Sequence, residues 1–74
     1  EDIPHEDGHT DSLLPQVMKL KPKYRIVLYM FYYEDMSVRR IAEVLGESAS
    51  AVTTRLSRAR TQLKKLLLEE GYNE

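Results

Sequence analysis

Residues 37–63, SVRRIAEVLGESASAVTTRLSRARTQL, predict two helices joined by a short turn. In the first helix, apolar residues recur at steps of three and four and form one stripe: Val38, Ile41, Ala42 and Leu45. Ser37 is the expected N-cap, because its hydroxyl can accept a free backbone N–H of the first turn. Gly46 suits a left-handed C-terminal position. The turn is short enough to bring the second helix in at a steep angle, as a helix-turn-helix requires.

The second helix divides into an apolar edge and a polar edge. Its apolar residues fall in one narrow sector: Val52, Leu56, Ala59, Leu63 and Leu66. The opposite side carries small hydroxyls and one arginine: Ser50, Thr54, Ser57, Arg58 and Thr61, with Thr53 at the margin. Arg55 and Arg60 flank the apolar stripe on opposite sides. Either Ser48 or Ser50 caps this helix, and the sequence does not choose between them.

This division suits a helix that reads DNA. One face anchors the helix in its own domain, and the other can enter the major groove, where guanidinium groups reach guanine or phosphate. The simpler interpretation is a surface helix that is polar outside and apolar inside. The preceding helix and the short turn favour the DNA-binding interpretation.

Four pieces of the chain follow one another in a recognisable order. They are residues 14–15 (LP) or 20–22 (LKP) leading into 24–28 (YRIVL), then 32–37 (YYEDMS), 41–46 (IAEVLG) and 52–60 (VTTRLSRAR). Together they resemble region 4 of an RNA polymerase sigma factor of the extracytoplasmic-function (ECF) class. Each piece alone is weak, but all four in order make a specific signal.

The chain departs from the family pattern at a few positions near the presumed reading face. Arg40 stands where the family often has glutamate, and Ser50-Ala51 stand in place of Gly-Thr. Thr53 replaces a common lysine or arginine, and Ser57 a larger side chain. These changes leave the fold prediction intact, and they fall where the promoter sequence would be read.

The resemblance implies an all-α domain, a bundle of about four helices with a helix-turn-helix. It also implies binding to the −35 element of double-stranded promoter DNA, as part of an alternative sigma factor that directs RNA polymerase. The residues expected to face bases are Thr53, Thr54, Ser57 and Arg58. Those expected to contact phosphates are Ser37, Arg39, Arg40, Arg55 and Arg60.

The resemblance further implies protein partners, namely the flap of the polymerase β subunit or an anti-sigma factor. Both would use an apolar groove formed by the first helices. The candidate docking residues are Leu14, Val17, Met18, Leu28 and Tyr32.

The rest of the chain fits one small domain with short ends. Residues 1–11 read as a flexible acidic linker, 12–71 as the domain and 72–74 as a tail. A first helix is expected from Ser12 or Leu13 to Leu20. Pro22 then starts a second helix, which extends to Tyr33 and is apolar almost all round. Such a helix must be buried on more than one side or serve an interface.

Charge is distributed unevenly along the 74 residues, although the net charge is only −1. Residues 37–65 carry seven basic and two acidic side chains, a local charge of +5, whereas residues 1–12 carry acidic side chains and no lysine or arginine. The positive charge of residues 37–65 is typical of a surface that faces phosphate groups.

Several classes of function find no support in the sequence. No apolar run approaches the ~20 residues of a membrane span, and no nucleotide-binding or catalytic motif is present, so neither an enzyme nor a cofactor or small-molecule substrate is expected. His5 and His9 make an improbable metal site. Absence of cysteine fits the cytoplasm, and the resemblance implies that this is the cytoplasm of a bacterium. Because the chain lacks an initiator methionine, we expect it to be part of a longer protein.

Two alternatives remain open at this stage. One is a stand-alone helix-turn-helix regulator that binds a palindrome as a dimer, with Leu63, Leu66 and Leu67 in the dimer seam. The other is a protein-interaction module that binds an anti-sigma factor or polymerase. Oligomeric state tests the first alternative, and partner binding without DNA affinity tests the second.

Overall fold

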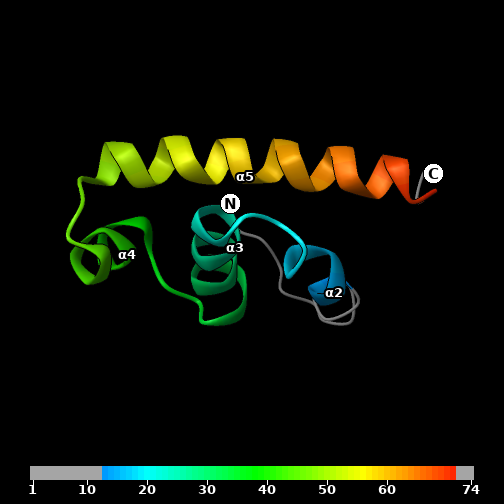
Figure 1. The fold of residues 1–74 in the computed structure, drawn as a ribbon. Coiled ribbons are helices and arrows are strands. Elements are labelled where there is room, and N and C mark those ends of the chain that lie inside the picture. Colours follow the sequence, from blue (N-terminus) through cyan, green and yellow to red (C-terminus); the bar gives the residue numbers. More distant parts are fainter. Residues whose placement is uncertain (1–12, 72–74) are drawn as a thin grey trace.

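One long helix organises the domain. A computed structural model of the chain describes residues 13–71, in which α5 (Ala49–Glu69) is the longest element. The helices α2 (Leu14–Val17), α3 (Pro22–Leu28) and α4 (Val38–Leu45) all lie against one side of α5 (Figure 1). A π-helical segment, η1 (Tyr29–Tyr33), continues α3, and the described residues contain no strand. The prediction of an all-α domain with about four helices is confirmed. The predicted linker and tail lie outside the described residues.

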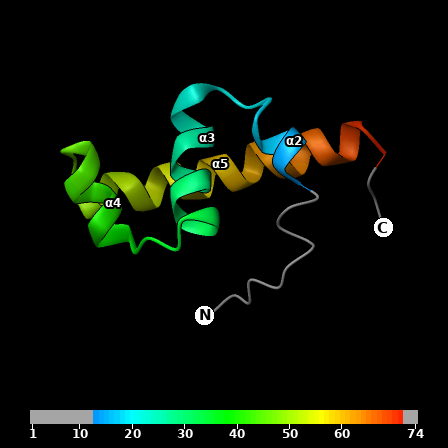
Figure 2. The ribbon, with the colours of Figure 1, turned by 90° about the horizontal axis from the view of Figure 1, so that it is seen from below.

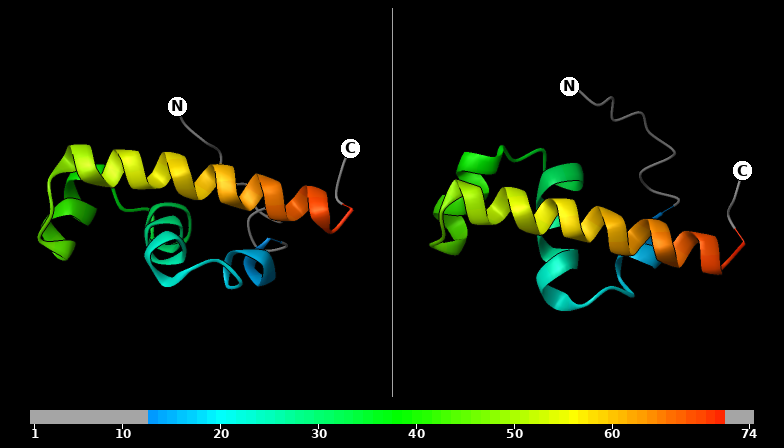
Figure 3. Two further views of the ribbon diagram at one scale, coloured as in Figure 1. Left: turned by 45° about the horizontal axis from the view of Figure 1, so that its top comes forward. Right: turned by 90° about the horizontal axis from the view of Figure 1, so that it is seen from above.

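The three shorter helices meet α5 at successive points along its length. α4 lies at its beginning, α3 crosses its middle steeply, and α2 lies near its end (Figures 1 and 2). Seen from above, α5 lies in front of all three (Figure 3). One long face of α5 is therefore covered by no other described helix.

The core lies between α5 and the helices beneath it. Its buried residues are Val17, Leu20, Val27, Leu28, Ile41, Ala42, Val52, Leu56 and Ala59. The apolar stripe predicted on α5 faces this core, but burial decreases along it: Val52 and Ala59 are fully buried, whereas Leu63 and Leu66 are half-buried. Burial decreases because α3 and α4 cover the first half of α5, while only the short α2 covers its end.

The capping signals of the helix-turn-helix are present in the structure. The hydroxyl of Ser37 accepts the backbone N–H of Arg40 at 3.0 Å, and that of Ser48 accepts the N–H of Ala51 at 3.0 Å. Ser48, rather than Ser50, is therefore the N-cap of α5. Gly46 adopts the left-handed conformation with φ of 70°, where a side chain would be strained. Local sequence thus sets both ends of the turn.

The first helix, α2, is shorter than the sequence predicts. α2 ends at Val17, and two tighter turns follow, in which Lys19 N–H and Leu20 N–H bond to carbonyls three residues back. The following Lys21 is extended with ψ of 148°. Proline imposes such a conformation on the residue before it, so Pro22 both interrupts the first helix and starts α3.

The end of the second helix also differs from the prediction. Instead of α-helix to Tyr33, the chain widens into η1, where Glu34 N–H bonds to the Tyr29 carbonyl five residues back, at 3.1 Å. Asp35 then turns left-handed with φ of 57°. Most aromatic rings here are half-buried, and that of Tyr29 is 39% exposed. Because α3 crosses α5 steeply, it touches α5 over only a short length, and the domain cannot cover all its apolar sides.

A polar contact fastens α2 to the end of α5. Gln16 Nε2 donates to Glu70 Oε1 at 3.1 Å, and Lys19 Nζ donates to Glu70 Oε2 at 2.6 Å. The hydrogen bonds from Lys19 and then Gln16 lower the pKa of the Glu70 carboxyl. A lowered folded-state pKa means that the contact contributes stability at neutral pH and loses it as the pH falls through that value.

Candidate nucleic-acid interface

The uncovered face of α5 carries the residues predicted to read bases. Thr53, Thr54, Ser57 and Arg58 are all exposed, because the side chains one half-turn away on α5 are the ones that pack in the core. The four lie in the first half of the helix, directly after the turn from α4. This is the part of a second helix that reaches base edges in helix-turn-helix proteins.

The predicted phosphate-contacting residues differ in their present partners. Arg39 is exposed, and the described residues give it no ion-pair partner; the same holds for Arg58, which is predicted to face bases. Arg40 pairs with Glu43 at 3.2 Å, but both side chains are more than half exposed, so this pair is weak. The hydroxyl of Ser37 is already engaged as the cap of α4.

Arg55 is held by an acidic side chain from the turn. Its Nη2 lies 2.7 Å from Glu47 Oε1, and the two side chains are only 25% and 33% exposed. The pair neutralises a charge that the sequence predicts for phosphate binding. Arg55 therefore has less positive charge to offer DNA than its position on the helix suggests.

Arg60 is held by aromatic side chains of η1. Its Nε donates to the Tyr32 hydroxyl at 2.8 Å, and its guanidinium carbon lies 5.7 Å from the ring centroids of both Phe31 and Tyr32. The structure thus joins two residues that the sequence assigns to different tasks, one to DNA and one to a protein partner. They are 28 positions apart, and no local pattern indicates their contact.

A cleft between the start of α3 and the first half of α5 adds residues that the sequence does not single out. Its volume is about 320 Å³, and its lining is Lys23, Tyr24, Ala51, Thr54, Arg55 and Arg58. Three of these side chains are cationic and none is acidic, so the cleft suits an anionic group. In the sequence, Lys23 is marked only by a run of basic residues, Lys19, Lys21, Lys23 and Arg25, which extends into α3.

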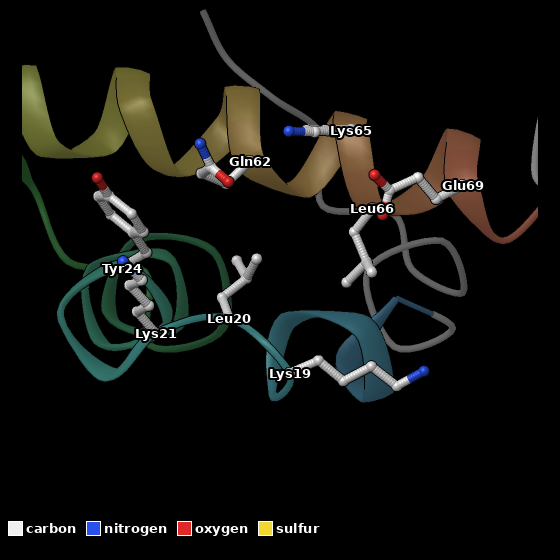
Figure 4. Close-up of a pocket in the computed structure, with 8 residues that line it drawn as sticks. All are labelled: Lys19, Leu20, Lys21, Tyr24, Gln62, Lys65, Leu66 and Glu69. Atoms are coloured by element: carbon white, nitrogen blue, oxygen red, sulfur yellow. The ribbon is translucent and has the colours of Figure 1, made fainter.

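A second cleft has a different character. It lies between the α2–α3 connection and the later half of α5, with a volume of about 350 Å³ (Figure 4). Lys19, Lys21 and Lys65 line it together with Glu69, and Leu20 and Leu66 form its apolar part. Its charge is mixed, and its α5 residues lie farther along the helix than Thr53 and Thr54. It is therefore separate from the reading face.

The predicted docking residues need correction at two positions. Val17 and Leu28 are 3% and 1% exposed and belong to the core, so their side chains are not available to a partner. The first helices use these residues to pack against α5 rather than to form an open groove. Met18 is 51% exposed, and Leu14 and Tyr32 are half-buried.

Residues 13–71 offer neither a membrane-spanning helix nor a metal site. No helix there has the length and apolarity needed to cross a bilayer, and no group of acidic or histidine side chains there is arranged to hold a metal ion. His5 and His9 lie outside the described residues.

Comparison with known proteins agrees with this geometry. A family model described as Sigma-70, region 4 matches residues 11–63. The chain is 41% identical over 65 residues to RNA polymerase sigma factor YlaC of Bacillus subtilis (strain 168), covering 88% of this chain and 38% of that protein. It is 33% identical over 58 residues to ECF RNA polymerase sigma factor SigW of the same organism, covering 78% of this chain and 31% of that protein.

The chain thus spans less than half the length of these relatives. No solved structure matches it significantly. The family match nevertheless covers well over half of the 74 residues, including all of α4 and α5 up to residue 63. The chain belongs to the sigma-70 region 4 family.

Proposed function

We propose that this domain binds the −35 element of a promoter as part of an alternative sigma factor and so directs RNA polymerase in transcription initiation. The observation that carries this proposal is the uncovered, hydroxyl-rich face of α5, which directly follows the helix-turn-helix turn and has arginines on both flanks. The site of action would be the bacterial cytoplasm, with no catalytic role, cofactor or small-molecule substrate.

The proposed reading mode places the first half of α5 in the major groove. Thr53, Thr54, Ser57 and Arg58 would address base edges, because hydroxyls suit several bases and arginine suits guanine. Arg39, Arg40 and the capped start of α4 would contact the phosphate backbone. The contacts of the exposed face of α5 would therefore read the DNA sequence. The phosphate contacts of α4 would position the domain on the DNA.

Phosphate groups on the two sides of the groove would meet different parts of the domain. On one flank of α5 the cleft beside Thr54 offers Lys23 and Arg58 to a phosphate. On the other flank stands Arg60, beside η1. A helix lying in the major groove has one DNA strand on each side, so cations on both flanks support this placement.

Protein partners are a second part of the proposal. RNA polymerase, through its β flap, or an anti-sigma factor would dock on apolar surface that the domain leaves uncovered. Met18 and Ile26 are 51% and 41% exposed. These two exposed side chains replace the buried Val17 and Leu28 as candidate contacts.

The test of the proposed function is selection from randomised duplex DNA, followed by affinity measurement at two salt concentrations. We expect enrichment of one short, non-palindromic element, with affinity that falls as salt rises. An inverted repeat would point instead to a dimeric regulator. Absence of enrichment, together with binding to the polymerase β flap, would mean that the main partner is protein.

Replacing Glu47 with glutamine is expected to strengthen binding to all DNA sequences. The change removes the carboxylate that lies 2.7 Å from Arg55 and so returns a positive charge to the flank of α5. The slope of log affinity against log salt should steepen by about 0.9, as for one added phosphate contact. Titrations of wild type and variant at four salt concentrations measure both effects.

Glu43→Gln is the matched control, because it removes the same charge from a pair that is more exposed. We expect it to change the slope much less, since Arg40 is already largely solvated. Equal effects of the two substitutions would show that only overall charge matters and that the Arg55–Glu47 contact has no special role.

A further inference from the structure

We propose that Tyr32 is a positioning residue for DNA binding, which orients the guanidinium of Arg60 toward a backbone phosphate. This inference rests on the proposed function and adds a residue of η1 to its interface. It starts from one contact: the Tyr32 hydroxyl accepts the Nε–H of Arg60 at 2.8 Å, while the Arg60 side chain is exposed.

The contact leaves the useful edge of the guanidinium available. Arginine has five N–H donors, and Tyr32 engages only the one on Nε. The donors on the two Nη atoms can form the paired hydrogen bonds that arginine makes with phosphate oxygens. Tyr32 therefore holds the Nε group of Arg60 and leaves both Nη groups available to a phosphate.

Two aromatic rings also support the guanidinium of Arg60. Phe31 and Tyr32 meet edge to face, with centroids 4.9 Å apart and an angle of 84° between their planes. The Arg60 guanidinium carbon lies 5.7 Å from each centroid, within the range of cation–π attraction. Such support reduces the rotamer freedom that a long side chain would otherwise lose on binding.

The partner of Arg60 also preserves its charge. Arg55, on the other flank of the apolar stripe, is held by the carboxylate of Glu47 and is neutralised by it. Tyr32 is a neutral acceptor, so Arg60 keeps its full positive charge for DNA. Of the two flanking arginines, Arg60 is both oriented and charged.

The backbone explains how Tyr32 comes to stand beside Arg60. The wider π-helical turn of η1 shifts the register of residues 29–33 relative to a continuous α-helix. α3 crosses under α5, so its continuation η1 emerges on the flank opposite the Lys23 cleft. The π turn thus has a functional consequence, because it sets the place from which Tyr32 reaches Arg60.

Tyr32→Phe tests the inference, because it removes the hydroxyl and keeps the ring. We expect the 74-residue chain carrying it to bind the selected element about three- to tenfold more weakly, from the lost ordering of one arginine. The salt slope should stay unchanged, since no charge is removed. Arg60→Gln should instead lower the slope by about 0.9, and adding Tyr32→Phe to it should have no further effect.

Tyr29→Phe is the matched control. It removes a hydroxyl from the same π turn, but its ring stacks on Tyr33 at 5.2 Å rather than on Arg60. We expect unchanged affinity. A direct readout without DNA is the exchange rate of the Arg60 Nε proton, which should rise in Tyr32→Phe and not in Tyr29→Phe.

The outcomes separate this inference from the proposed function. If the wild type selects an element and Tyr32→Phe binds it as tightly, or weakens binding equally in the Arg60→Gln background, the inference is overturned and the function stands. If the wild type selects no DNA, the function fails and the inference with it. If Tyr32→Phe weakens binding in the wild-type chain but not in the Arg60→Gln variant, at an unchanged salt slope, the result supports the inference and the proposed function.

Discussion

Replacing Leu56 with alanine is expected to lower the free energy of unfolding by about 2–5 kcal/mol, the range for removing a buried leucine side chain. Leu56 is 2% exposed and lies on α5 among core residues of the same apolar stripe. A domain with 59 described residues has only about 3–9 kcal/mol of total stability, by the usual scale of stability per residue. The substitution should therefore leave a large fraction of the chain unfolded at 37 °C.

Urea denaturation followed by circular dichroism measures this effect. Leu68→Ala is the matched control, because it makes the same change on the same helix at a side chain that is 56% exposed. We expect the control to stay within about 0.5 kcal/mol of the wild type. Equal losses for both variants would contradict the burial pattern and the side of α5 that faces the core.

The features that the sequence predicts well are those with a local cause. The cap at Ser37, the left-handed Gly46 and the helix start at Pro22 each follow from the chemistry of one residue and its near neighbours. The apolar stripe of α5 is equally local, because helical periodicity alone selects Val52, Leu56 and Ala59. These signals suffice to identify the helix-turn-helix and its exposed face.

The features that the sequence misses depend on how α3 crosses α5. That crossing brings Tyr32 to Arg60 and Lys23 to the cleft beside Thr54, although no spacing rule relates these positions. It also places Leu28 in the core, although the family resemblance implied that Leu28 belongs to a docking surface. The π turn at residues 29–33 has no recognisable sequence signal, since its aromatic run is equally compatible with a continued α-helix.

Replacing Arg58 with alanine is expected to change which DNA sequences the domain prefers. Arg58 is exposed beside Ser57 on the uncovered face of α5, and the described residues provide no ion-pair partner that would compete with a base. An arginine paired with guanine contributes about 1–3 kcal/mol of discrimination against a wrong base. Selection with the variant should therefore relax one position of the enriched element.

Arg39→Ala provides the comparison. Arg39 is also exposed and also lacks an ion-pair partner in the described part of the chain, but it lies on α4, away from the reading face. Its loss should weaken selected and scrambled DNA alike and lower the salt slope by about 0.9. Competition of both duplexes against each variant measures the two effects together.

Arg58 has one competing assignment, which the same experiment resolves. Its side chain also lines the cleft with Lys23 and Thr54, where the ligand would be a phosphate. If Arg58→Ala weakens selected and scrambled DNA equally, Arg58 belongs to the cleft, and base reading rests on Thr53, Thr54 and Ser57. If the preference changes at one base pair, Arg58 reads that base, and Lys23 is then the cleft's main unpaired cation, because Arg55 is neutralised by Glu47.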